Sequence, residues 1–131
     1  MIDSAAEFVR LRQSEIPEEY MRAANEEASH AVWVEVVDNY PDMRQWVAHN
    51  KTVPLSVLEV LAADPQSTVR HTVAMKRKLS PELFEALAKD PDETVRAAVA
   101  RNPKAPMDVL SRLCRDAVAL VSSAARSRVG T

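Results

Sequence analysis

The chain has 131 residues, of which 47% are hydrophobic and 27% are charged, a composition typical of one globular domain. It contains eight prolines but a single glycine, Gly130, whereas a chain of this length has about nine glycines on average. Glycine supplies the positive φ angles and the close backbone approach that phosphate-binding loops, dinucleotide fingerprints and tight β-hairpins need. The composition therefore excludes such loops and disfavours an antiparallel β domain.

The charge is unevenly distributed along the chain. Residues 1–40 hold 3 Lys/Arg against 9 Asp/Glu, and residues 41–131 hold 14 against 10, so the two parts carry −6 and +4. An acidic region beside a mildly basic body is a poor arrangement for non-specific nucleic-acid binding. The first residues are charged where a secretion signal would be apolar, and no stretch approaches the roughly 18 apolar residues of a membrane span. We therefore expect a cytoplasmic protein without membrane association.

The N-terminal residues predict a helical cap. Ser4 and Glu7 have the spacing of a capping box, which indicates a first helix. Pro17 begins a longer helical segment that we expect to continue to Val37. Glu35 stands at a position where the following sequence carries leucine, so one side of this segment should be exposed. The sequence thus predicts a cap over residues 1–37.

From residue 38 onwards the sequence repeats itself every 26 residues without a gap. Aligned in this way are three sets of residues: Asp38, Asp64, Asp90 and Asp116; Arg44, Arg70 and Arg96; and Leu61, Leu87 and Leu113. Apolar columns recur between them with the same period, as in Val47, Val73 and Val99. A fixed period of this length is the signature of a repeat architecture.

Each repeat is predicted to form two short helices. In residues 80–102, Ser80 can cap a first helix with Pro81 at its first position, and Asp90 can cap a second helix that Pro91 begins. Helices this short are unstable alone in water, so they must stack on neighbours. The predicted fold is therefore all-α: a single domain over residues 1–131, in which an α-solenoid of about three and a half repeats (38–126) follows the cap and precedes a tail (127–131).

The string Asp90-Pro91-Asp92-Glu93-Thr94-Val95-Arg96-Ala97-Ala98-Val99-Ala100-Arg101-Asn102-Pro103 resembles the leucine-rich repeat variant family and is similar to the core of HEAT repeats. The resemblance extends over residues 38–126. It implies a right-handed superhelix without a sheet, in which the second helix of each repeat is tightened toward a 3₁₀ form and lines the concave side. The cysteine-rich iron–sulfur segment associated with the family has no counterpart here, and Lys76 replaces the asparagine found at 50 and 102.

Two sets of basic residues are the candidate binding sites. The first is a row on the second helices, namely Arg44, Arg70, Arg96, His49 and His71. Its arginines either pair with the aspartates of adjacent repeats, as Arg70 could with Asp64 or Asp90, or grip acidic groups of a partner. The second set follows the ends of the same helices as a basic edge, and comprises Lys51, Lys76, Arg77, Lys78, Arg101 and Lys104. These cations either complement helix dipoles or bind an acidic partner.

Catalytic and metal sites are not indicated. The three histidines lack the spacing of metal ligands, and Cys114 aligns with Ala62 and Ala88, as a small core residue would. Trp46 aligns with Thr72 and Ala98, so it either covers the cap or anchors a partner. We expect no enzyme activity, cofactor or metal. The predicted function is protein–protein interaction with an acidic partner, as an adaptor, regulator or antitoxin-like protein; the alternative is nucleic-acid binding through the basic edge.

Overall fold

The computed structural model describes residues 1–130, and over these residues the protein is all-α. One short 3₁₀ helix, η1 (Pro41–Met43), precedes α4. The α-helices are α1 (Ala5–Gln13), α2 (Pro17–Asn25), α3 (His30–Asn39), α4 (Arg44–His49), α5 (Leu55–Leu61), α6 (Ser67–Ala74), α7 (Pro81–Ala88), α8 (Glu93–Arg101), α9 (Met107–Leu113) and α10 (Ala119–Val129). Within the described range the only β-type pairing is a single bridge between Ile2 and Ala28.

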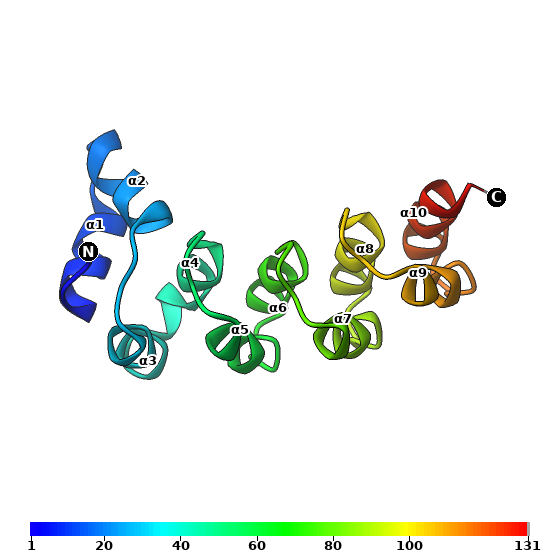
Figure 1. Cartoon of the computed structure of the whole chain (residues 1–131), viewed down its shortest axis with the longest axis horizontal. Coiled ribbons are helices and arrows are strands. Elements are labelled where there is room, and N and C mark those ends of the chain that lie inside the picture. The colour runs from blue at the N-terminus through cyan, green and yellow to red at the C-terminus, as the bar shows by residue number, and fades with distance from the viewer. Residues whose placement is uncertain (131) are drawn as a thin grey trace. The chain divides into compact units, whose positions relative to one another are not determined.

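Contacts divide the chain into two compact units, residues 1–61 (unit 1) and 62–131 (unit 2). We call the odd-numbered helices the first helices and the even-numbered ones the second helices. In unit 2, α7 packs on α9, while α6, α8 and α10 pack side by side in a second layer (Figure 1). In unit 1, α1 packs on α3 and α2 packs on α4. Each unit is therefore built of helix pairs in two layers, and the prediction of one domain over the whole chain stays a prediction.

The apolar columns of the repeat form the cores of these layers. Val73 and Val99 are fully buried in the second helices, and Leu87 is 1% exposed in a first helix. In unit 1 the core contains larger side chains: Phe8 packs edge-on against Trp33, with ring centroids 5.3 Å apart. Burying such side chains stabilises each helix by about 1.5–3 kcal/mol per residue. This burial supplies the stability that helices of this length do not have alone in water.

The predicted helix starts are confirmed where serine caps them. The side chain of Ser4 accepts a hydrogen bond from the backbone N–H of Glu7, and that of Ser80 accepts one from Leu83. Pro81 occupies the first helical position of α7, as predicted. Cys114, expected in the core, is half-buried at the C-terminal end of α9.

The prediction of a single long helix from Pro17 to Val37 is wrong, because α2 ends before Glu26 and α3 begins after Ser29. The side chain of Asn50, far along the sequence, binds the carbonyl oxygens of Ala23 and Glu26 and holds the break open. Ser29 then caps α3 by accepting from the N–H of Val32. Tertiary hydrogen bonds thus override a continuous helical pattern.

Two further expectations need correction. The 3₁₀ form implied for the second helices occurs only in η1 before α4 in residues 1–130, whereas α6, α8 and α10 are α-helical. Residues 127–129, predicted to belong to a tail, continue α10 as far as Val129. The last residue of that predicted tail, 131, lies outside the described residues.

Candidate binding surfaces

The arginine column forms an internal clamp in unit 2. Arg70 donates through Nε to Asp90 at 2.8 Å and through Nη1 to the carbonyl oxygen of Asp64 at 2.8 Å. Arg96 repeats this geometry one repeat later: Nε lies 2.8 Å from a carboxylate oxygen of Asp116, and Nη1 lies 2.8 Å from the carbonyl oxygen of Asp90. We call these two arrangements the Arg–Asp clamps.

The clamps are largely shielded from solvent. The side chains of Arg70 and Arg96 are only 14% and 17% exposed. Hydrogen bonds that the guanidinium groups donate to the carboxylates of Asp90 and Asp116 raise the pKa of both arginines. The Arg96 guanidinium in turn lowers the pKa of Asp116 below its ordinary value. Because the guanidinium N–H groups are committed inside the fold, this geometry favours the structural interpretation of the arginine ladder over the gripping of a partner.

Each aspartate of the clamps also shapes the turn before a second helix. The carboxylates of Asp64, Asp90 and Asp116 accept hydrogen bonds from the backbone N–H two residues later. The prediction that Asp90 is the N-cap of α8 is therefore wrong. Asp92 is the N-cap, and the helix begins at Glu93. Asp90 instead makes an Asx-type turn that places the helix start three residues on.

Arg44, the first member of the column, has a different environment. Its Nε donates to the carbonyl oxygen of Val37 at 2.8 Å. Asp38, which aligns with the clamp aspartates, is exposed and lies within α3 rather than in a turn. Arg44 thus directs Nε at a backbone carbonyl oxygen of α3, whereas Arg70 and Arg96 direct Nε at an aspartate.

A second internal clamp was not anticipated from the sequence. Asn102 donates from Nδ2 to the carbonyl oxygens of Ala74 and Lys76, at 2.8 and 2.6 Å, and Asn50 binds Ala23 and Glu26 in the same manner. Both asparagines are at most 2% exposed. We call them the amide clamps.

The amide clamps belong to a column of period 26. Arg128, 26 residues after Asn102, donates from Nη1 to the carbonyl oxygens of Ala100 and Asn102. Lys76 occupies the position midway between Asn50 and Asn102. The sequence signal was the recurrence of a hydrogen-bond donor at 50, 76, 102 and 128. Substitution by lysine and arginine hid it, because the three side chains share only the capacity to donate.

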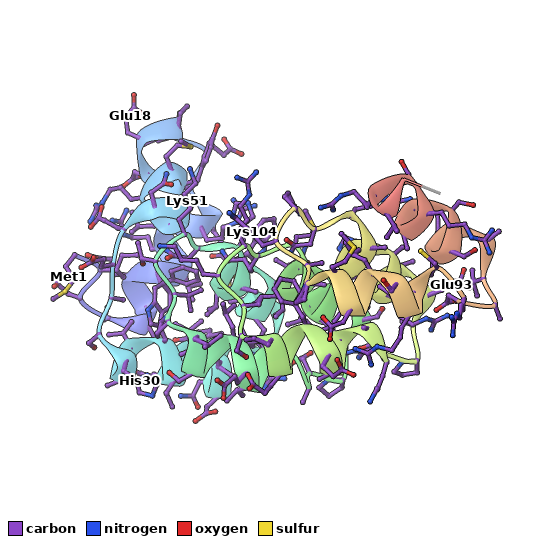
Figure 2. The ribbon with its side chains drawn as sticks, turned by 45° about the vertical axis from the view of Figure 1, so that its right-hand side comes forward. Met1, Glu18, His30, Lys51, Glu93 and Lys104 are labelled. Atoms are coloured by element: carbon purple, nitrogen blue, oxygen red, sulfur yellow. The ribbon has the colours of Figure 1, made fainter. Side chains whose placement is uncertain are left out.

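The remaining members of the predicted row and edge are distributed over both units. His49 and Lys51 are exposed in unit 1, and His71 is half-buried in α6 of unit 2. Lys76 is half-buried, whereas four other edge residues are exposed: Arg77, Lys78, Arg101 and Lys104. Arg101 is the last residue of α8. Lys104 follows the helix, at the end away from Glu93 (Figure 2). The structure thus brings His71, Arg77 and Arg101 together around one hollow of unit 2.

That hollow and a neighbouring one form what we call the basic groove. The first, of about 340 Å³, lies between α6 and α8 and is lined by His71, Met75, Arg77, Ala98, Arg101, Asn102 and Pro103. The second, of about 640 Å³, lies between α8 and α10 and is lined by Arg101, Ala119, Leu120, Ser123, Ala124, Ser127 and Arg128. Arg101 lines both. Neither hollow has an acidic residue in its lining, so far as residues 1–130 are concerned.

Unit 1 carries a separate hollow of about 220 Å³, which is lined by residues of α1, α2 and α4. It is lined by Arg12, Tyr20, Met21, Ala23, Ala24, Trp46 and His49, and we call it the Trp46 hollow. The Arg12 guanidinium lies over the Trp46 ring at 3.5 Å, and the His49 ring meets that indole edge-on at 5.9 Å. Trp46 is half-buried, so it contacts the N-terminal helices and also borders the hollow.

The described residues show no group of three or more His, Cys, Asp or Glu side chains that could hold a metal ion. Over the same part of the chain, no helix combines the length and the apolar character that crossing a bilayer demands.

With this geometry established, comparison with known proteins adds one finding. Residues 93–118 match the family described as leucine rich repeat variant. The match covers α8, α9 and the turn before α10, which includes the Arg96–Asp116 clamp. The resemblance drawn from the sequence is therefore confirmed over these residues. No curated protein and no solved structure matches the chain significantly.

Proposed function

We propose that this protein is a non-enzymatic helical-repeat module that binds an acidic segment of a partner protein in the basic groove of unit 2. The match to a helical-repeat family supports an interaction module, and it also supports the right-handed solenoid predicted for the repeats. Fold alone does not specify what such a module binds, so the proposal depends on the chemistry of the groove.

The observation that carries the proposal is the division of the basic residues into two classes. Arg70 and Arg96 are engaged by aspartates inside the fold, whereas Arg77 and Arg101 are exposed and line the groove. Exposed guanidinium groups with no acidic neighbour in the lining match the carboxylates of a partner in charge and in planar geometry.

The groove also presents apolar side chains, which define the segment further. Met75 is 58% exposed and Leu120 is 42% exposed, and each lines one of the two hollows. A segment that interleaves aspartate or glutamate with apolar residues would cover both while it pairs with the arginines. Nucleic acid fits less well, because none of the residues lining the groove is a Trp, Tyr or Phe on which bases could stack.

Selection of random displayed peptides on the full-length chain tests the proposal. The enriched peptides should combine Asp or Glu with apolar residues. Their affinity should fall about tenfold in the double variant Arg77→Ser/Arg101→Ser. The matched control is Lys89→Ser/Arg115→Ser, which removes two positive charges from unit 2 without touching the groove. Equal losses in the two double variants, or enrichment of peptides without acidic residues, would overturn the proposal.

Titration of duplex DNA and single-stranded RNA, followed by fluorescence anisotropy, distinguishes the alternative function, nucleic-acid binding, from the proposed one. Binding of either at physiological salt more tightly than any selected peptide, with a steep salt dependence that Arg77→Ser/Arg101→Ser abolishes, would establish the nucleic-acid function instead. Absence of such binding at low salt would eliminate it.

A further inference from the structure

The Trp46 hollow contains an arginine whose environment differs from that of the other arginines with described partners. Arg10 pairs with Glu19, Arg22 with Glu26 and Arg70 with Asp90. Arg12 has no carboxylate within ion-pair distance among residues 1–130, and its Nε is buried without a hydrogen-bond acceptor. A buried donor without an acceptor costs free energy, so the fold holds this guanidinium in place without an internal carboxylate partner.

What holds Arg12 is the aromatic ring beneath it. The guanidinium carbon lies 3.5 Å from the centre of the Trp46 ring. Stacking of this kind occupies the face of the guanidinium and orients it, while its N–H edge remains suited to planar, bidentate recognition of a carboxylate. The stack therefore preorganises a positive group at the wall of the hollow.

Trp46 is not required by the repeat. The positions that align with it at 26-residue intervals are Thr72, Ala98 and Ala124. The second helices of unit 2 thus pack with small side chains in this column, and the indole at 46 adds an aromatic wall that the helix-pair architecture does not demand. Trp46 is thus an addition to the repeat that also positions Arg12, which has no carboxylate partner. Binding of a ligand would explain both features.

The rest of the lining defines the ligand. Met21, Ala23 and Ala24 are apolar, while Tyr20 and His49 add polar groups at the rim. No acidic side chain is included in the lining, within the described part of the chain. The volume of about 220 Å³ is below the roughly 300–1,000 Å³ of pockets for drug-sized ligands. It suits a single aromatic or aliphatic group that carries one carboxylate.

We infer that the Trp46 hollow binds a carboxylate attached to an aromatic or aliphatic body of amino-acid size. The carboxylate pairs with Arg12, and the body packs on the indole of Trp46 and the apolar side chains of α2. The carboxylate can belong to a free small acid or to the C-terminal residue of a peptide, which present the same chemistry. This site lies in unit 1 and is independent of the basic groove.

Indole N–H resonances in a ¹H–¹⁵N spectrum of the full chain test this site with an internal control. The protein has two tryptophans, and Trp33 is buried against Phe8 at 1% exposure. Titration with 3-phenylpropionate should shift the Trp46 resonance saturably, with a Kd on the order of millimolar for so small a ligand, and leave Trp33 unmoved. The neutral amide 3-phenylpropionamide should bind about tenfold more weakly, and inorganic phosphate should give no saturable shift.

Variants assign the interaction to its residues. Arg12→Gln keeps the hollow and should make the acid bind no better than the amide, whereas Lys51→Gln, which removes a charge from unit 1 outside the lining, should leave the preference intact. Trp46→Thr installs the residue found at 72 and should abolish binding, as detected by saturation-transfer spectra of the ligand. An unchanged Trp33 resonance establishes that each variant is folded.

N-acetylphenylalanine represents the peptide C-terminus in the same titration. Tighter binding than that of 3-phenylpropionate would assign the site to a peptide end, and weaker binding would assign it to a free acid. Equal affinity for the acid and its amide, a response to phosphate equal to that of the acid, or no Trp46 shift at saturating acid would overturn the proposal.

Discussion

The arginines of the two units show how differently one residue type is used. In unit 2, Arg70 and Arg96 are nearly buried and each binds an aspartate 20 residues ahead, in the same geometry. In unit 1, Arg12 lies on Trp46 without a carboxylate beside it, and Arg44 binds a backbone carbonyl of α3 through Nε. Arg70 and Arg96, which are placed by the period of the repeat, maintain the helix stack, whereas Arg12, which lies outside the period, is available for other chemistry.

The largest effect that would test this difference is expected from Arg70→Ala. The substitution leaves the buried carboxylate of Asp90 without its guanidinium, and we expect the free energy of unfolding to fall by about 3 kcal/mol. Arg12→Ala in unit 1 removes a stacking contact and should cost less than about 1 kcal/mol. Urea denaturation followed by circular dichroism measures both. Equal losses would show that Arg12 is as structural as Arg70 and would erase the contrast.

The amide clamps should instead behave alike in the two units. Replacing Asn50 or Asn102 by alanine removes the hydrogen bonds that the amide makes to two carbonyl oxygens, one of them in a buried bond, and to one backbone N–H. We expect each substitution to lower the free energy of unfolding by about 2 kcal/mol. Asn39→Ala, at an exposed position of α3, is the control and should change it little. A loss of stability in Asn102→Ala but not in Asn50→Ala would mean that other groups satisfy the carbonyl oxygens at the end of α2 in unit 1.

Helix capping gives a smaller effect that again should be shared. Ser29 caps α3 in unit 1 and Ser80 caps α7 in unit 2 by the same side-chain hydrogen bond. Alanine at either position should cost about 1 kcal/mol. The N-cap of α6, Gln66, makes no such bond, so Gln66→Ala should be nearly neutral. Thermal unfolding of the three variants measures these losses of stability. A loss for Gln66→Ala as large as that for the two serine variants would contradict the prediction.

The smallest expected effect is in the pH dependence of the clamp in unit 2. Because Arg96 lowers the folded-state pKa of Asp116, the clamp stabilises the fold fully above the ordinary aspartate pKa of about 3.9. That contribution is lost as the pH falls through the lowered value. Urea midpoints of the wild type and Arg96→Ala should therefore converge between pH 5 and about pH 2. A constant difference across this range would show that Arg96 acts by packing alone.

The sequence predicted those parts of the fold that its periodicity encodes. The helix pairs and their buried faces follow from columns such as Val73 and Val99, and the partner of Arg70 was among the aspartates that the same period offers. Local signals failed where a distant contact decides the backbone. The break after Asn25 depends on Asn50, and the start of α8 depends on an Asx turn that Arg70 helps to fix.

The candidate sites were predicted less completely for a related reason. Positive charge alone could not distinguish Arg96, which is engaged internally, from Arg101, which lines the groove, although they are five residues apart in the same helix. Trp46 was singled out because it is too large for its column. Its stacking with Arg12 depends on how α1 meets α4, and no spacing in the sequence reports that.

The clamps have a consequence for how the length of this protein can change. Asn102 and Arg128 recognise backbone carbonyl oxygens 26 and 28 residues earlier, and Arg70 and Arg96 recognise carboxylates 20 residues later. If residues 77–102 were deleted, Arg70 would meet Asp116 at the same separation of 20, and Arg128 would reach the carbonyl oxygens of Ala74 and Lys76. Recombination in steps of one whole repeat therefore gives each remaining clamp residue an equivalent partner at the same separation, so shortened or extended versions of the chain keep the same pattern of clamps.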